Sequence, residues 1–113
     1  MLATVLQSAK HRTAGGNIVL VQVQRTSREG EISATVDKQP VSYKIVALSG
    51  THVLKVGAHF YASFDQEGLN EEEIRNGSES SFRIRVYDSV TDLRQAEELL
   101  KNYCGMSDVV EVP

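Results

Sequence analysis

The sequence predicts an α+β fold: a bent antiparallel sheet of five strands, forming a roll or a small barrel, with a helix at each end of the chain. Apolar and polar residues alternate through several middle segments, which is the period of strands with one buried face. The first and last segments instead space their apolar residues as amphipathic helices do. The chain has 113 residues, the length of a single domain, so residues 1–113 are expected to fold as one unit.

The first helix is expected over residues 2–12. Its apolar residues stand at offsets of 0, 3, 4 and 7, and they are Leu2, Val5, Leu6 and Ala9. This spacing places them in one stripe along a helix, and a strand, for which the alternation is less clean, is the alternative. Gly15 and Gly16 follow, and glycine is common just past a helix end.

Three strands are expected next, over residues 18–24, 31–37 and 41–48. The first two carry regularly alternating apolar residues, which are Val19, Val21, Val23, Ile32, Ala34 and Val36. Residues 27–30 read as a tight turn, so these two strands are predicted to form a hairpin. Pro40 cannot donate a ladder hydrogen bond, so it marks the start of the third strand.

A fourth, longer strand is expected over residues 52–65, with a bend or bulge at Gly57. Residues 66–80 are polar and predict a long loop, in which Asn70 caps a helical turn over Glu71–Glu73. A fifth strand follows over 81–87, with Phe82, Ile84 and Val86 facing inward.

The second helix is expected to begin at a cap formed by Ser89 or Thr91 and to end at Gly105. Its buried stripe is expected to consist of Leu93, Ala96, Leu100 and Tyr103. Residues 106–113 are expected to form either a short edge strand or a frayed tail.

The segment Leu54–Asp65 reads LKVGAHFYASFD. It resembles the K-x-G-x-x-V-x-A-x-F strand of small oligonucleotide-binding-type barrels, which include the oxyanion-binding modules of transport ATPases. The resemblance covers about a tenth of the chain, and no site residue is transferred from it.

Charge and cysteine content limit the function classes. The net charge is −3 and the estimated isoelectric point is 5.6, whereas proteins that coat duplex nucleic acid or anionic membranes use clustered positive charge. Cys104 is the lone cysteine, so no internal disulfide is expected, as suits a reducing compartment. No secretory leader and no membrane-spanning apolar run is recognised, so a cytoplasmic location is expected.

No pattern in the sequence predicts catalysis. Cys104 falls near a predicted helix C-terminus, where the helix dipole raises a thiol pKa instead of lowering it. His11, His52 and His59 have no zinc-ligand spacing, and Glu71–Glu73 lacks the ligand order of a calcium loop. The sequence therefore predicts a protein that is not an enzyme and that holds no metal or cofactor.

One group of side chains is predicted to form a binding face. If the strands over 52–65 and 81–87 pair, their outward residues bring cations and aromatic rings to one side of the sheet. These residues are Lys55, His59, Tyr61, Arg83, Arg85 and Tyr87. Arginine and tyrosine beside each other are favoured in protein interfaces, and they also stack and neutralise single-stranded nucleic acid.

The leading hypothesis is a non-enzymatic protein-interaction module: a small accessory, adaptor or inhibitor subunit that contacts another protein or a second copy of itself. A single-stranded nucleic-acid-binding protein that uses the same sheet face is the first alternative. A barrel that binds a small anionic ligand is the second. No partnership with a membrane is expected.

Overall fold

The computed structural model describes residues 1–12, 16–29, 32–35, 42–50, 52–64, 71–75 and 81–104. Eight strands and one helix fall within these ranges. In chain order they are β1 (Leu2–Lys10), β2 (Asn17–Gln24), β3 (Thr26–Glu29), β4 (Ile32–Thr35), β5 (Ser42–Leu48), β6 (His59–Tyr61), β7 (Glu71–Arg75), β8 (Ser81–Val90) and α1 (Leu93–Cys104).

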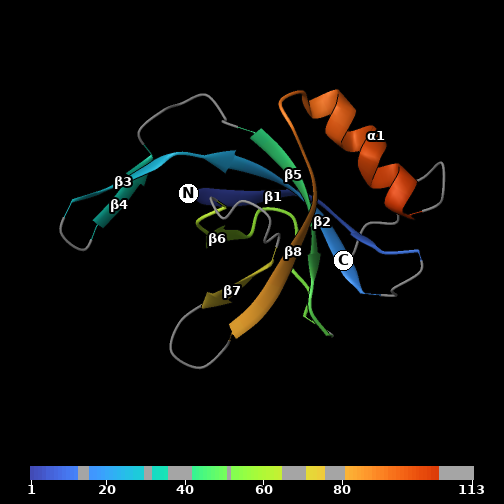
Figure 1. Ribbon diagram of the computed structural model, residues 1–113, viewed down its shortest axis with the longest axis horizontal. Helices are drawn as coiled ribbons and strands as arrows, with labels where there is room; N and C mark the ends of the chain where they lie inside the picture. Colours follow the sequence, from blue (N-terminus) through green and yellow to red (C-terminus); the bar gives the residue numbers. More distant parts are fainter. Residues whose placement is uncertain are drawn as a thin grey trace.

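Six of the strands form one sheet in the order β6-β1-β2-β5-β8-β7, and every neighbouring pair is antiparallel. Strands β1, β2 and β5 lie in sequence order, and β6 returns to lie beside β1, which is the Greek-key arrangement. Strands β3 and β4 form a separate two-stranded ribbon that reaches away from the main sheet (Figure 1).

The sheet curls until its two edge strands approach each other. Glu72 of β7 accepts hydrogen bonds from the residues that follow β6. The Ser63 amide donates to both carboxylate oxygens, at 2.9 and 3.1 Å, and the Ser63 hydroxyl donates at 2.8 Å. The Phe64 amide donates at 3.3 Å. These contacts make the sheet a nearly closed barrel, with Glu72 bridging the seam between β6 and β7.

Two separate apolar cores form on the two faces of the sheet. The core inside the barrel consists of Ala3, Val5, Val19, Val21, Val23, Val46, Leu48, Leu54, Phe60, Ala62, Ile74, Phe82 and Ile84. The outer core lies under α1 and consists of Ala9, Ile18, Leu20, Ile45, Ala96, Leu100 and Cys104. Strand β2 supplies both, which is why Ile18 to Val21 are all fully buried. Helix α1 thus covers part of the outer face of the barrel (Figure 1).

The predicted N-terminal helix is wrong, because residues 2–10 form strand β1. The register against β2 shifts between Val5 and Gln7, so Leu6 is the extra residue of a β-bulge. Before the bulge, Ala3 and Val5 belong to the inner core. After it, Leu6 and Ala9 pack on the outer core. A strand that changes its buried face at a bulge imitates helical spacing.

The predicted long strand over 52–65 and the count of five strands are also corrected. Only His59–Tyr61 is a strand, and the chain turns at Val56 and Gly57, where Gly57 has a φ of 92°. Residues 71–75, expected to hold a helical turn, form β7 because Ile74 is buried in the barrel and the segment pairs with β8. Part of the predicted turn at 27–30 belongs to β3.

The predicted hairpin between the strands over 18–24 and 31–37 is wrong, because β2 pairs with β1 and β5 whereas β4 pairs with β3. Other expected elements are confirmed with adjusted ends. Strands β2 and β5 match the expected strands over 18–24 and 41–48, and β8 extends beyond the predicted residue 87 to Val90. Helix α1 is capped by Asp92 and not by the expected Ser89 or Thr91, because the Asp92 carboxylate accepts the Gln95 amide at 3.2 Å. Of its expected buried stripe, Ala96 and Leu100 are buried whereas Leu93 is exposed. Residues 105–113 lie outside the described ranges. In the part of the chain that the structure describes, no helix is long and apolar enough to cross a membrane.

Candidate functional site

The expected pairing of the strands over 52–65 and 81–87 is wrong. Strand β6 pairs with β1, whereas β8 pairs with β5 and β7. Three of the six expected face residues, Lys55, His59 and Tyr61, therefore lie near the β1–β6 edge, and all three are exposed. His59 is tied locally, because its Nδ1 lies 3.0 Å from the Thr4 hydroxyl.

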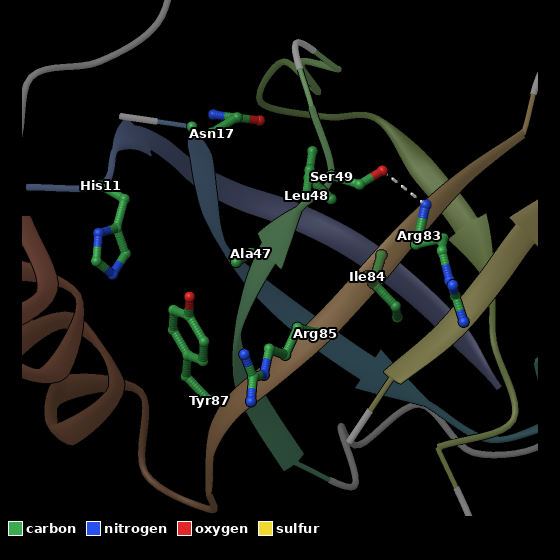
Figure 2. Close-up of a pocket in the computed structure, with 10 residues that line it drawn as sticks. His11, Asn17, Ala47, Leu48, Ser49, Arg83, Ile84, Arg85 and Tyr87 are labelled. Carbon is green, nitrogen blue, oxygen red and sulfur yellow. Dashed lines mark hydrogen bonds between the residues drawn. The ribbon is translucent and has the colours of Figure 1, made fainter. Parts of the chain in front are cut away.

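The other three residues line a pocket on the outer face of the barrel. The pocket has a volume of about 290 Å³ (Figure 2). Its lining is His11, Gly16, Asn17, Ala47, Leu48, Ser49, Arg83, Ile84, Arg85 and Tyr87. The end of β1, the start of β2, the end of β5 and the middle of β8 thus meet there. Sequence reasoning missed His11 because it assigned the first segment to a helix.

The alternation of β8 places the charged and aromatic side chains on the outer side. Phe82 and Ile84 are buried in the barrel, whereas Arg83 and Arg85 are exposed. The register against β5 shifts at Tyr87, which packs on the outer core under α1. The three predicted residues of β8 therefore follow one another along the same face.

An aromatic cluster forms one wall of the pocket. The Tyr87 ring stacks on Tyr103 of α1, with centroids 5.1 Å apart, and meets the His11 ring edge-on at 5.6 Å. The Tyr103 hydroxyl donates to Asp88 Oδ2 at 2.5 Å. Burial, followed by this hydrogen bond and the charge of Asp88, raises the pKa of Tyr103 to about 12. Tyr103 therefore stays protonated, and able to donate to Asp88, at a higher pH than an ordinary tyrosine.

The opposite wall is fixed by backbone contacts between β5 and β8. The Ser49 hydroxyl accepts the Arg83 amide at 3.0 Å, and the Ser49 amide donates to the Arg83 carbonyl at 2.9 Å. Figure 2 shows the Arg83 side chain extending over β7, while the Arg85 side chain runs toward Tyr87. Arg85 is thus the guanidinium that reaches the aromatic wall.

Strand β7 places an acidic side chain beside the basic side chains of β8. Arg83 is the register partner of Glu73, and Arg85 is the partner of Glu71. Directly opposite residues of an antiparallel pair project to the same face. The exposed Glu73 therefore lies on the same face as Arg83, and this surface is not uniformly basic.

A buried polar network supports the pocket from behind. Asn17 donates to the Ser8 hydroxyl and the Ala9 carbonyl, both at 2.9 Å, and accepts the Leu54 amide at 2.9 Å. Ser8 in turn donates to the Leu54 carbonyl at 2.7 Å. The network fastens Leu54 to Ser8 of β1 and to Asn17, which lines the pocket at the start of β2.

The described side chains offer binding contacts more than reactive groups. Burial raises the pKa of the Cys104 thiol, which makes it a poor nucleophile. Within the described ranges, no three His, Cys, Asp or Glu residues lie together as a metal site. The pocket lining instead offers groups that bind ligands through hydrogen bonds, charge and ring packing. These are guanidinium, imidazole, amide and hydroxyl groups around the floor at Ala47.

No protein-family model matches the chain, and the searches of curated proteins and of solved structures also give no match.

Proposed function

We propose that this chain is a protein-interaction module that receives an anchor side chain of a partner protein in the outer-face pocket. The observation that carries the proposal is the position of Arg83, Arg85 and Tyr87 around one concave site. Arginine and tyrosine are the residue types that dominate binding energy in interfaces, and such residues cluster around pockets.

The structure of the pocket supports a rigid anchor site. Tyr87 is held by two ring contacts, and Ser49 fixes the backbone of Arg83. A pre-ordered site loses less side-chain entropy on binding than a mobile surface. The apolar floor at Ala47 with a polar rim follows the usual anatomy of an interface core.

The charge pattern defines the chemistry of the partner. Because Arg83 stands opposite the exposed Glu73, a complementary surface carries charges of both signs around an apolar or aromatic anchor. A second copy of this chain carries the same mixed pattern and is one form of such a partner.

The nucleic-acid alternative receives less support. Tyr61 and Tyr87 lie on strands that are not neighbours, and one face of the Tyr87 ring is occupied by Tyr103. A shared stacking platform for successive bases is therefore not formed by these two rings. Glu73, which lies opposite Arg83, also reduces the positive potential along β8.

A small anionic ligand is the second candidate, and the pocket volume of about 290 Å³ with Arg85 and His11 in its lining favours it. Thermal unfolding with added phosphate or dicarboxylates tests whether such a ligand binds, because a ligand of the native state raises the unfolding temperature. A rise that disappears in Arg85→Ala supports the ligand. No rise at any concentration refutes it.

Photo-crosslinking tests the proposed function in the native host. A photoreactive amino acid at Arg83, on the rim, is compared with the same residue at Asn102, which is exposed on α1. We expect adducts with a defined protein, or with a second copy of the chain, only from position 83. The purified partner is then titrated by calorimetry, where Arg85→Ala is expected to weaken binding about tenfold or more, equivalent to about 1.4 kcal/mol.

Two results would overturn the proposal: equal adducts from both positions, or a partner whose affinity is unchanged by Arg85→Ala. Because Arg85 is exposed, its replacement is expected to leave the urea midpoint nearly unchanged. Urea unfolding of this variant therefore separates lost contacts from lost folding.

A further inference from the structure

One lysine of the barrel differs from the other described lysines in its surroundings. Lys44 of β5 is partly buried, whereas Lys10, Lys55 and Lys101 are exposed. The register partner of Lys44 on β2 is Val21, which belongs to the inner core. Directly opposite residues of an antiparallel pair share a face, so the Lys44 side chain extends from the inner side of the barrel wall.

Two neighbours hold the amine of Lys44 in place. Its Nζ donates to the Ser89 hydroxyl at 3.0 Å, and Ser89 is the register partner of Lys44 on β8. The same Nζ lies 5.3 Å from the centroid of the Phe64 ring, which packs on the inner core. Because Ser89 is exposed, a small molecule from solvent reaches this place. An oriented amine therefore stands beside an aromatic face.

Among the described residues, no carboxylate forms an ion pair with Lys44. Asp88 adjoins Ser89 but lies on the outer face, where it accepts the Tyr103 hydroxyl. Glu72 is bound by the amides that follow β6. Although the ring face attracts the ammonium, burial lowers the pKa of Lys44. A larger share of this amine is therefore neutral and nucleophilic than in an unburied lysine.

We propose that Lys44 is a site at which an aldehyde that carries an aromatic ring becomes covalently attached as an imine. The Nζ lone pair attacks the carbonyl carbon to form a carbinolamine. Both amine protons then leave with the carbonyl oxygen as water, and the C=N bond remains without any change of oxidation state. The ring of the aldehyde packs on Phe64, where the ammonium lay before. This site is separate from the outer-face pocket and does not depend on the proposed function.

Reductive trapping on the folded chain tests the proposal. The chain is incubated at neutral pH with benzaldehyde and cyanoborohydride, which reduces an imine to a stable amine, and labelled lysines are located by peptide mass mapping. We expect several-fold more label at Lys44 than at Lys10, Lys55 or Lys101, and nearly equal labelling of the four in urea. Lys44→Arg keeps the charge and should leave labelling of the other three unchanged.

A second comparison separates the amine from the ring. In Phe64→Leu, labelling of Lys44 by benzaldehyde should fall several-fold, whereas labelling by formaldehyde, which has no ring, should not fall. The urea midpoint reports whether this variant is folded. If it is not, the wild-type chain carries the same test, because its ratio of benzaldehyde to formaldehyde labelling should be higher at Lys44 than at Lys101.

Three results would overturn the proposal. The first is labelling of Lys44 that does not exceed that of the exposed lysines. The second is benzaldehyde labelling of Lys44 that is unchanged in folded Phe64→Leu. The third is a benzaldehyde-to-formaldehyde ratio at Lys44 no higher than at Lys101.

Discussion

Replacing Asn17 by alanine is expected to destabilise the barrel strongly although Asn17 is polar. The side chain is only 5% exposed and makes three hydrogen bonds, to the Ser8 hydroxyl, the Ala9 carbonyl and the Leu54 amide. A buried group left without a partner costs about 1–3 kcal/mol.

The magnitude follows from counting these bonds. At a net contribution of about 1 kcal/mol for each bond, Asn17→Ala loses about 3 kcal/mol of unfolding free energy. Ser8→Ala removes one donor to Leu54 and one acceptor for Asn17, so it is expected to lose about 2 kcal/mol. These losses are a large share of the roughly 5–15 kcal/mol that stabilises an ordinary domain.

Urea unfolding followed by circular dichroism measures this loss. With a denaturant slope of about 1.5 kcal/mol per molar, Asn17→Ala should lower the midpoint by about 2 M. Asn102→Ala on the exposed side of α1 is the matched control and should change stability by less than about 0.5 kcal/mol. A midpoint shift for Asn17→Ala no larger than that of the control refutes the reasoning. If Asn17→Ala does not fold, Ser8→Ala carries the same test.

Three further changes test other contacts of the fold. Glu72→Ala removes the acceptor of the Ser63 amide and hydroxyl, so the barrel seam should loosen, with a loss of about 1–2 kcal/mol and faster hydrogen exchange at the Ser63 amide. Tyr103→Phe removes the hydroxyl that donates to Asp88, and with it the tyrosine absorbance change near pH 12. Because the folded pKa of Tyr103 lies above its unfolded value of about 10, its stabilisation is complete below pH 10 and is lost as the pH rises toward 12. Gly57→Ala should cost about 1–2 kcal/mol in urea unfolding, because the φ of 92° strains any side-chain-bearing residue.

Each of these three predictions has its own control or contradicting outcome. Glu73→Ala, on the same strand but exposed, should leave Ser63 exchange unchanged, and equal acceleration in both variants contradicts the seam assignment. A tyrosine titration identical in Tyr103→Phe and the parent contradicts the shifted pKa. Gly16→Ala meets only ordinary contacts, with the nearest atom the Leu48 carbonyl at 3.6 Å, so it should be close to neutral. Similar losses for both glycines would contradict the backbone explanation.

The parts of the fold that the sequence predicted correctly are those where one local pattern persists through the whole element. Strand β2 alternates valines on the inner face without interruption, and α1 keeps its helical spacing from Ala96 to Leu100. In both, local preference and tertiary burial agree. The antiparallel, sheet-dominated character of the domain follows from such elements.

The errors arise where long-range contacts decide. Leu6 occupies a bulge, and a bulge exchanges the two faces of a strand, so the alternation of β1 cannot be read from its own residues. In β7, Glu71–Glu73 favours a helix start by local rules, but pairing with β8 and burial of Ile74 select the strand. Neither the partner strand nor the barrel interior is visible in a local window.

In the candidate site, too, local patterns were predictable from the sequence and long-range contacts were not. Arg83, Arg85 and Tyr87 line one pocket, because alternate residues of a strand share a face and the register shift at Tyr87 leaves its ring on that side. Their expected companions on the strand over 52–65 depended on a guessed pairing, and the sheet order places that segment beside β1 instead. The residues that complete the pocket, His11 and Ser49, come from strand ends that only the β1–β2 and β5–β8 pairings bring together. The period of two within a strand therefore indicates which of its side chains share a face. The order of strands in the sheet decides which strands contribute side chains to the same pocket.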